Sequence, residues 1–285
     1  MTGSGVRSVI ITGCSSGIGL CVAEGLRSRG YRVFATARRE ADVQRLAGDG
    51  FESIRLDLSN SESIAAALEE ILDRTENRLY ALFNNGGYGQ PGAVEDLTTE
   101  VLRAQFETNF FGWHELTRRI LPVMRAQGEG RIIQNSSVLG FITLKFRGAY
   151  NASKFALEGL SDTLRLELNG TNVHVSLIEP GPIVSRFREN AYRAFKANID
   201  AERSSHRKAY VSLERRLADS ENEPPFTLPA SAVLRKVVHA LESGRPKPRY
   251  YVTVPTYGFG VLKRLLPTRL LDRLLISASG AEVRH

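Results

Sequence analysis

The chain has 285 residues, of which 42 % are apolar and 24 % are charged, and it has two cysteines. These values are typical of a soluble globular protein and exclude a disulfide-stapled or low-complexity chain. The net charge of +7 belongs to the C-terminal part, because residues 1–185 have 19 basic and 21 acidic side chains whereas residues 186–285 have 19 and 10. The basic residues form no recognisable nucleic-acid-binding module, so we expect no nucleic-acid partner.

Short β-branched segments alternate with amphipathic segments along most of the chain. Strands are predicted at residues 7–12, 31–37, 51–58, 79–85, 130–137, 173–181 and 249–254. Helical periodicity is present at residues 17–30, 42–48, 59–74, 98–126, 149–168 and 229–244. Such alternation predicts an α/β fold with a doubly wound parallel sheet of about seven strands and helices on both faces. We expect a single domain over residues 1–285.

A glycine-rich segment, TGCSSGIG, joins the first predicted strand to the first helix, with glycines at Gly13, Gly17 and Gly19. Glycine permits a tight turn and the close approach of a pyrophosphate, and the helix N-terminus supplies free N–H groups. Ser15 and Ser16 add hydroxyl donors. Plain packing glycines are the alternative, but the flanking strand and helix favour dinucleotide binding.

The end of the second strand discriminates between NAD and NADP. NAD-binding chains usually carry an acid there, which holds the ribose 2′-hydroxyl. This chain has Ala37 at that position, followed by Arg38 and Arg39. Arginine pairs with a 2′-phosphate, so we expect NADP(H) as the cofactor, although a solvated basic turn would give the same pattern.

The segment YNASK places Tyr150 and Lys154 one helical turn apart on the same face. Taken alone, this pair is a weak motif, because an ordinary solvated helix face gives the same spacing. Its meaning depends on the segments that accompany it.

Those segments give residues 6–255 a resemblance to the short-chain dehydrogenase/reductase family. The resemblance rests on TGCSSGIG, LDL at 56–58, NNGG at 84–87, NFFG at 109–112, NSSVLG at 135–140, YNASK and PGPIVS at 180–185. Gly86 replaces the alanine usual in the family, and Ser185 replaces threonine. Within the family, the chain is most similar to the NADP(H)-dependent group of 17β-hydroxysteroid and retinol dehydrogenases and bacterial broad-range aldehyde reductases. The resemblance implies a Rossmann-type fold and hydride transfer between the nicotinamide and a carbonyl or alcohol.

The resemblance implies a catalytic set of Tyr150, Lys154, Ser137 and Asn109. Tyr150 is expected to donate a proton to the substrate oxygen in reduction and to accept one in oxidation. An unperturbed tyrosine has a pKa of about 10, so we expect the Lys154 ammonium to lower the pKa of Tyr150. Ser137 is expected to orient the carbonyl, and Asn109 to hold a water. On its residues alone, Asn109 could equally be an ordinary buried helix residue or mark a helix bend.

The family pattern also implies the residues that contact the cofactor. These are Gly13, Ser15, Ser16, Gly17, Ile18, Gly19, Arg38, Arg39, Asp57, Leu58, Asn85, Gly86, Tyr150, Lys154, Pro180, Gly181, Ile183 and Ser185. We assign no metal site, and we interpret Glu24, Glu158 and Glu167 as acids on helix surfaces.

Ligands of doubly wound sheets lie beyond the carboxyl ends of the strands, which makes Tyr88, Phe141, Leu144 and Phe187 candidate substrate contacts. Their apolar character favours a hydrophobic aldehyde or ketone, with an alcohol in the reverse direction. Residues 184–228 interrupt the alternation, and we expect them to form a substrate lid. A hydroxysteroid or retinol dehydrogenase and a 3-ketoacyl-type reductase are the enzyme alternatives. A non-catalytic NADP(H)-sensing protein is disfavoured, because the Tyr-Lys-Ser set is intact.

Residues 256–285 are rich in leucine with interleaved lysine and arginine, which predicts an amphipathic C-terminal extension. This extension could contact a membrane surface weakly, but packing over the substrate mouth or against another subunit is favoured. We expect a homodimer or homotetramer formed through residues 98–126 and 149–168. No apolar run is long enough to span a bilayer and no secretory signal is present, so we expect a cytoplasmic protein.

Overall fold

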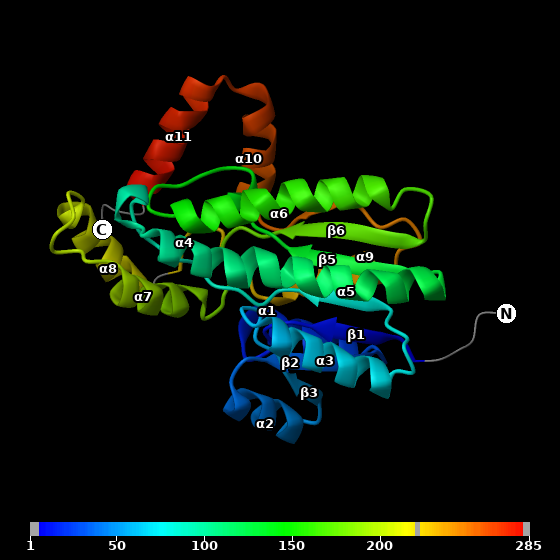
Figure 1. Cartoon of the computed structure of the whole chain (residues 1–285). Helices are drawn as coiled ribbons and strands as arrows, with labels where there is room; N and C mark the ends of the chain where they lie inside the picture. Colours follow the sequence, from blue (N-terminus) through cyan, green and yellow to red (C-terminus); the bar gives the residue numbers. More distant parts are fainter. Residues whose placement is uncertain (1–5, 220–222, 282–285) are drawn as a thin grey trace.

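The computed structural model describes residues 6–219 and 223–281. Within them, seven strands form one parallel sheet in the order β3-β2-β1-β4-β5-β6-β7, with helices on both faces (Figure 1). The strands are β1 (Ser8–Ile11), β2 (Arg32–Ala37), β3 (Glu52–Arg55), β4 (Ala81–Asn84), β5 (Gly130–Asn135), β6 (Val173–Glu179) and β7 (Arg249–Tyr251). The predicted Rossmann-type, doubly wound sheet is therefore confirmed.

Helices follow the strands in the alternation that the periodicity predicts. They are α1 (Gly17–Arg27), α2 (Glu40–Gly48), α3 (Ser61–Arg74), α4 (Thr99–Phe106), α5 (Gly112–Gln127), α6 (Gly148–Glu167), α7 (Phe187–Asn198), α8 (Arg207–Ala218), α9 (Ser231–Glu242), α10 (Val254–Leu265) and α11 (Thr268–Ala281). Two short 3₁₀ segments, η1 (Val94–Asp96) and η3 (Val138–Gly140), lie in the loops after β4 and β5.

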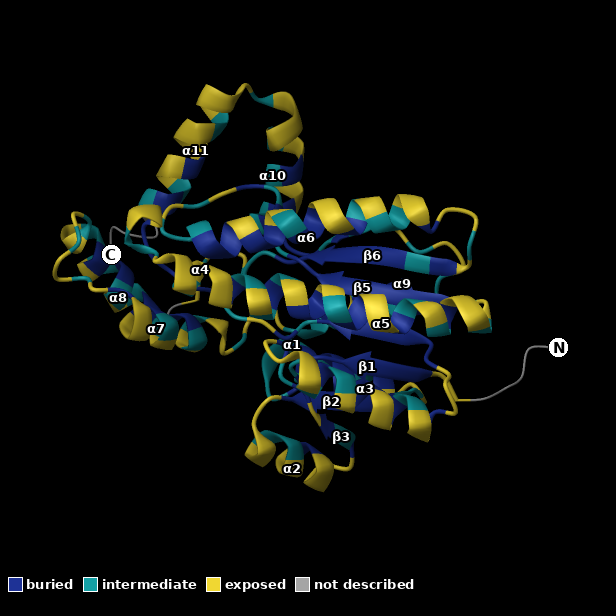
Figure 2. Cartoon of the chain, viewed as in Figure 1, coloured by how far each residue is buried: buried dark blue, intermediate teal, exposed yellow. Residues whose placement is uncertain are grey.

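The core lies in two layers, one on each face of the sheet. Side chains alternate between the faces of a strand, so Val9 and Ile11 of β1 pack with α1, α2 and α9, whereas Ile10 packs with α3, α5 and α6. The strands are dark blue along most of their length in Figure 2, as expected of a parallel sheet covered on both faces.

The long helix expected over residues 98–126 is interrupted. A single π-helical turn, η2 (Glu107–Phe111), separates α4 from α5, and α5 continues through Pro122. Isolated π-helical turns occur frequently at functional sites. Here the turn contains Asn109, for which a helix bend was one of the two sequence-based alternatives.

Residues 184–228 form a small helical layer beside the sheet. Helices α7 and α8 enclose their own apolar cluster, centred on Phe195 and Tyr210. The Tyr210 hydroxyl donates to the Asp96 carboxylate and accepts a hydrogen bond from the Ala93 N–H at 2.8 Å. These contacts fix the layer to the loop after β4. Residues 220–222 of this segment lie outside the described residues.

A buried cluster of charges connects α6 with β6 and β7. The Arg249 guanidinium donates to the carboxylates of Glu158, Glu179 (2.6 Å) and Asp162 (2.5 Å). Glu179 is fully buried and Glu158 is 6 % exposed. The interpretation of Glu158 as a surface acid is therefore wrong. Several buried residues of α6 are polar, so the apolar periodicity of the helix did not indicate that Glu158 is buried.

The charge cluster predicts a pH-dependent stability. Burial and the neighbouring Glu158 charge raise the pKa of Glu179 from 4.5 to about 8. The folded state therefore holds more protons than the unfolded state between these two pH values, and the free energy of unfolding falls as the pH rises through them. Glu179→Gln should flatten this dependence in chemical denaturation measured at several pH values. The exposed Glu62→Gln variant should keep the wild-type slope, and an equal slope in both variants would contradict the assignment.

Candidate active site

The predicted site residues come together at the carboxyl edge of the sheet. Strand β1 pairs with β2 on one side and with β4 on the other, so the connections from β1 and β4 diverge there. Ligands of doubly wound sheets bind at such a switch point. The loops after β1, β4, β5 and β6 bring the predicted glycine, asparagine, serine and proline residues to this edge.

The glycine-rich loop has the geometry of an anion cradle. Gly13 and Gly17 have φ angles of +71° and +59°, which favour glycine. A Cβ atom on Gly19 would lie 2.2 Å from the Gly13 carbonyl oxygen. Ser16 precedes α1, but its side chain forms no capping hydrogen bond, so the N–H groups of the first turn keep no side-chain partner. Open backbone, free N–H groups and the helix dipole fit the pyrophosphate of a dinucleotide.

Side chains at the strand ends connect this loop to Lys154. The Thr12 hydroxyl accepts hydrogen bonds from the N–H groups of Asn85 and Gly86, both at 2.8 Å. The Asn85 amide donates to the Thr12 carbonyl at 2.9 Å and accepts from the Asn135 amide at 2.9 Å. The Asn135 carbonyl in turn accepts from Lys154 Nζ at 2.8 Å. A continuous chain of contacts thus crosses the ends of β1, β4 and β5.

Lys154 is buried in an aromatic and polar environment. Its Nζ atom lies 4.1 Å from the centre of the Trp113 ring and 5.7 Å from that of Tyr150. Trp113 is held in place by a 2.8 Å hydrogen bond from its indole N–H to the Gly86 carbonyl. Burial lowers the pKa of Lys154 to about 7, and the Glu158 carboxylate opposes this fall.

Tyr150 lies one turn before Lys154 on α6 and is also buried. Burial raises the pKa of Tyr150 to about 12, and a hydrogen bond from Ser137 and the Arg147 charge oppose the rise. Lys154 was expected to lower the pKa of Tyr150, whereas in this structure the pKa of Tyr150 is raised. Desolvation of the phenolate outweighs the stabilising groups, and Lys154 is itself directed to the Asn135 carbonyl.

Asn109 is fully buried, but its side chain is already engaged. Its amide donates to the Tyr88 carbonyl at 2.8 Å, and its oxygen accepts from the Tyr88 N–H at 3.1 Å. Asn109 therefore fixes the loop after β4 through two hydrogen bonds. The amide keeps a second N–H donor and its oxygen a second lone pair, so the expected water-holding role of Asn109 stays a prediction.

The two arginines after β2 differ in their surroundings. Arg39 forms an ion pair with Asp42 at 2.7 Å. Within the described residues, the Arg38 guanidinium forms no ion pair or hydrogen bond, and its charge lowers the pKa of Tyr88 against the larger effect of burial. Arg38 is thus the arginine whose charge is free to face the site.

The other predicted adenine contacts lie in a well-packed corner. The Asp57 carboxylate accepts hydrogen bonds from the Ser59 N–H and hydroxyl, at 3.0 and 2.7 Å. A Cβ atom on Gly112 would lie 2.0 Å from the Leu58 carbonyl oxygen. Leu58 therefore acts here as a close packing contact between the loop after β3 and the start of α5.

The segment after β6 returns to the glycine loop. The Pro180 carbonyl accepts from the Val138 N–H at 2.8 Å, and Ile183 forms a β-bridge with Leu228. A Cβ atom on Gly17 would lie 3.0 Å from Cβ of Ser185. A Cβ atom on Gly181 would lie 2.2 Å from the Thr253 hydroxyl, so glycine is required there. Ser185 and the glycine loop therefore face one another. The glycine loop residues Ser15 and Ile18 are both half-buried.

The four predicted substrate contacts divide into two groups. The Phe187 ring packs edge-on against Tyr150, with centroids 5.3 Å apart, and lies over Gly89 next to Tyr88. The Phe141 ring packs against Tyr251 instead, at 5.6 Å.

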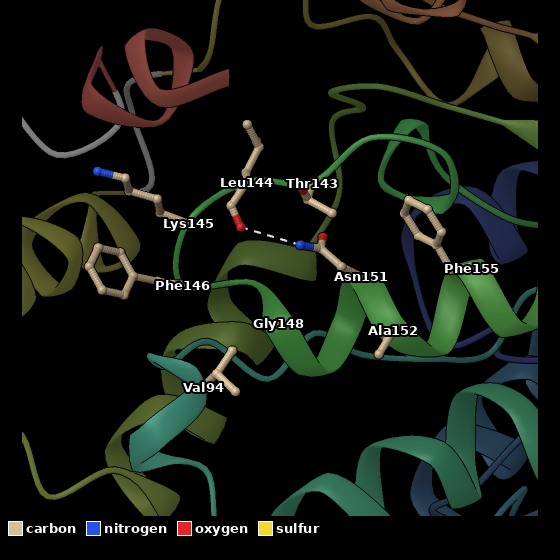
Figure 3. A pocket seen from close by; sticks show the side chains of 9 residues that line it. All are labelled: Val94, Thr143, Leu144, Lys145, Phe146, Gly148, Asn151, Ala152 and Phe155. Carbon is tan, nitrogen blue, oxygen red and sulfur yellow. Dashed lines mark hydrogen bonds between the residues drawn. The ribbon is translucent and has the colours of Figure 1, made fainter. Parts of the chain in front are cut away.

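Leu144 lies on a separate open groove of about 420 Å³, which contains no predicted catalytic residue (Figure 3). The groove lies along the outer side of α6, where Asn151 donates to the Leu144 carbonyl at 3.3 Å. Its position therefore gives no support to the prediction of Leu144 as a substrate contact.

Four residues that contact the site were not predicted from the sequence, namely Thr12, Trp113, Asn135 and Glu158. Thr12 and Asn135 were included only as parts of motifs, and Trp113 lies within the helix predicted over residues 98–126 without being singled out. Only Glu158 had a signal in the sequence, which was its spacing. It follows Lys154 by four residues and therefore lies on the same helix face.

Comparison with known proteins gives the same assignment along nearly the whole chain. A family model described as short chain dehydrogenase matches residues 7–195. The uncharacterized oxidoreductase YbbO of Escherichia coli is 44 % identical over 274 residues, with 94 % of each chain covered. The NADPH-dependent 3-dehydrocapnine reductase of Ornithobacterium rhinotracheale is 31 % identical, with 94 % of this chain and 96 % of the relative covered.

A solved structure supports the fold as well. A short-chain dehydrogenase/reductase from Burkholderia phymatum, in complex with NAD, superposes with a TM-score of 0.75 at 26 % identity, covering 93 % of this chain and 94 % of that one. These matches agree with the glycine loop, the strand order and the helix that carries Tyr150 and Lys154. The chain belongs to the short-chain dehydrogenase/reductase family and is an oxidoreductase.

Proposed function

We propose that the protein is an NADP(H)-dependent oxidoreductase that interconverts a hydrophobic aldehyde or ketone and its alcohol. The observation that carries this proposal is the set formed by Tyr150, Ser137 and Lys154 at the switch point of the sheet, next to the glycine loop. The phenol is in hydrogen-bonding contact with Ser137, and a buried amine follows one helical turn later.

Tyr150 is the proposed proton donor in reduction. Its raised pKa keeps the phenol protonated at neutral pH, so a proton is available for the oxygen of a carbonyl group. Ser137 aligns that oxygen by hydrogen bonding, and Lys154 supplies positive charge close to the phenol as the proton leaves. In oxidation the phenolate accepts the proton from the alcohol, which explains why a cationic neighbour is useful in both directions.

The cofactor is proposed to lie between the glycine loop and the segment after β6. Its nicotinamide supplies or accepts the hydride. Gly13, Ser15, Ser16, Gly17, Ile18 and Gly19 would hold the pyrophosphate, and Asp57, Leu58, Asn85 and Gly86 the adenine side. Pro180, Gly181, Ile183 and Ser185 would border the nicotinamide. The unpaired Arg38 supports NADP(H) over NAD(H), because its guanidinium is available to a 2′-phosphate.

An apolar substrate is supported by the rings beside Tyr150. Phe187 covers one side of the phenol, and Tyr88 borders the same loop. We propose that residues 184–228 act as a lid within a single domain, since they carry Phe187 and enclose a small core of their own. The relative named as an NADPH-dependent 3-dehydrocapnine reductase supports a reductive reaction, and a hydroxysteroid or retinol substrate stays an alternative.

A homodimer or homotetramer through α5 and α6 remains a prediction. Helix α6 exposes large apolar side chains in the monomer. Leu166 is 66 % exposed, and Phe155 and Leu160 are also exposed.

Replacing Tyr150 tests the proton donor directly. Tyr150→Phe should reduce kcat for aldehyde reduction by at least about a hundredfold, the usual contribution of a positioned general acid. Binding of NADPH, followed by its fluorescence, should change little, because the ring and its packing against Phe187 remain. The exposed Tyr257→Phe variant serves as the control and should keep full activity. Full turnover by Tyr150→Phe would end the proposal.

Replacing Arg38 tests the cofactor preference. Arg38→Gln should lower kcat/KM for NADPH by about ten- to hundredfold, as expected for loss of a hydrogen bond to a charged group. The value for NADH should stay nearly the same. Arg39→Gln is the matched control and should have a smaller effect, because Asp42 already pairs with Arg39. Equal kcat/KM values for NADH and NADPH in the wild type would contradict the preference.

The pH dependence of reduction tests the role of Lys154. The reductive kcat/KM should decline as the pH rises through about 7, because Lys154 loses its proton there while Tyr150 keeps its own. Glu158→Gln should move this decline to lower pH, because the Glu158 charge raises the pKa of Lys154. The exposed Glu167→Gln variant, on the same helix, should leave the profile in place. A profile unaffected by Glu158→Gln would show that Lys154 is not the group that titrates.

A further inference from the structure

Helices α10 and α11 form a hairpin that stands away from the body of the protein (Figure 1). Its buried residues are confined to its two feet, with Thr256 and Gly260 in the first seven residues of α10, and Leu275 and Ser279 in the second half of α11. No residue between Val261 and Leu274 is buried. The outer part of the hairpin is yellow in Figure 2, in agreement with this distribution. The hairpin is therefore fixed at its base and unsupported at its tip.

The two feet are held by specific contacts. The Ser279 hydroxyl of α11 accepts a hydrogen bond from the Lys145 N–H at 3.1 Å and donates to the Leu275 carbonyl at 2.7 Å. On α10, a Cβ atom on Gly260 would lie 2.6 Å from the Tyr251 ring, so the helix packs closely there. These contacts give the projecting tip a fixed direction.

The exposed tip carries several large apolar side chains, and their contact with water is unfavourable. Leu265 at the turn is 73 % exposed, and Val261, Leu270, Leu274 and Ile276 are each more than 40 % exposed. A group of exposed large side chains marks a surface that contacts a partner or a membrane. The groove of Figure 3 adjoins the hairpin, because the Lys145 N–H at one end donates to Ser279 of α11 and the Phe155 ring at the other lies 5.0 Å from Lys263 Nζ of α10.

The charges on the hairpin select among possible occupants of this surface. Its basic residues are Lys263, Arg264, Arg269 and Arg273, and Asp272 is the one acid within Val254–Ala281. The three arginines form no ion pair with any residue that the structure describes. A second copy of the hairpin would bring like charges together, which disfavours self-association. An anionic surface complements both the arginines and the leucines between them.

We propose that the α10–α11 hairpin docks the protein on the surface of an anionic phospholipid bilayer. The leucines of the tip enter the boundary between head groups and acyl chains, and the arginines contact the phosphates. No helix in the described ranges is long and apolar enough to cross a bilayer, so the contact is one of docking on the surface. This proposal goes beyond the proposed reaction and does not depend on its substrate.

Vesicle co-sedimentation of the full-length protein tests the docking. The protein should sediment with vesicles that contain phosphatidylglycerol and much less with pure phosphatidylcholine. Each basic residue near an anionic membrane contributes about 1 kcal/mol, or roughly a fivefold change in partitioning. The triple variant Arg264→Gln/Arg269→Gln/Arg273→Gln should therefore lose about a hundredfold. The triple variant Arg78→Gln/Arg235→Gln/Arg245→Gln has the same net charge, changes exposed arginines away from the hairpin and the lid, and should bind as the wild type does.

Two further variants separate the apolar contribution from the charge. Leu265→Ser/Leu270→Ser should weaken sedimentation with anionic vesicles, whereas Leu102→Ser/Leu166→Ser, on other exposed surfaces, should not. Turnover of a water-soluble aldehyde reports that each variant is folded, and should stay unchanged. Equal losses in the hairpin and control variants would overturn the proposal. The proposal would also be overturned if the wild type did not sediment with anionic vesicles. It would be overturned too if the hairpin variants lost sedimentation only because an oligomer dissociated.

A fluorescence measurement locates the tip. The chain has one tryptophan, Trp113, which is fully buried. In Leu270→Trp, the added emission should shift to shorter wavelength with anionic vesicles, because the indole leaves water. Tyr192→Trp, on α7, is the matched control and should not respond. An unchanged spectrum of Leu270→Trp in the presence of vesicles that bind the protein would show that another surface makes the contact.

Discussion

The candidate active site depends on the chain of hydrogen bonds that joins Thr12, Asn85, Asn135 and Lys154. Three separate strand ends must meet in register before any of these bonds forms. Once they meet, the glycine loop and the amine of Lys154 are positioned by one another, although 142 residues separate Thr12 from Lys154 in the sequence (154 − 12). The close approach of Gly13 to Gly86 follows from the same register and leaves no room for a larger residue at Gly13, where a Cβ atom would lie 2.6 Å from Cα of Gly86.

Burying Lys154 is costly, and the structure offsets that cost with three kinds of contact. The Asn135 carbonyl accepts one of its hydrogens, the Trp113 ring faces the ammonium, and the Glu158 carboxylate lies one turn away. A desolvated cation over an indole ring contributes ~2 kcal/mol. The desolvation cost that these contacts do not offset lowers the pKa of Lys154, so the amine titrates near neutral pH. An amine poised in this way responds to small changes in neighbouring charge.

Much of the fold was predictable, since alternating strands and helices have distinct periods and each strand here is short and apolar. The glycine loop was predictable for a similar reason, because its spacing has a local geometric cause. The sequence could not show which polar side chains point inward. Glu158 and Asn135 have neighbours that come from distant segments, such as Arg249 on β7 and Asn85 after β4. The contact of Asn109 was not visible for the same reason, as its partner is the backbone of Tyr88.

Position in the fold, more than residue type, relates the hairpin to the proposed cofactor site. The hydroxyl of Thr253, just before α10, would lie 2.2 Å from a Cβ on Gly181, and that of Thr256 lies near the same point. The loop containing Gly181 ends at Ser185, which faces Gly17 of the glycine loop. The feet of the hairpin and the phosphate cradle therefore pack on opposite sides of one short segment. A hairpin docked on a bilayer would hold the carboxyl edge of the sheet in a fixed orientation to that surface, because no flexible linker separates the two.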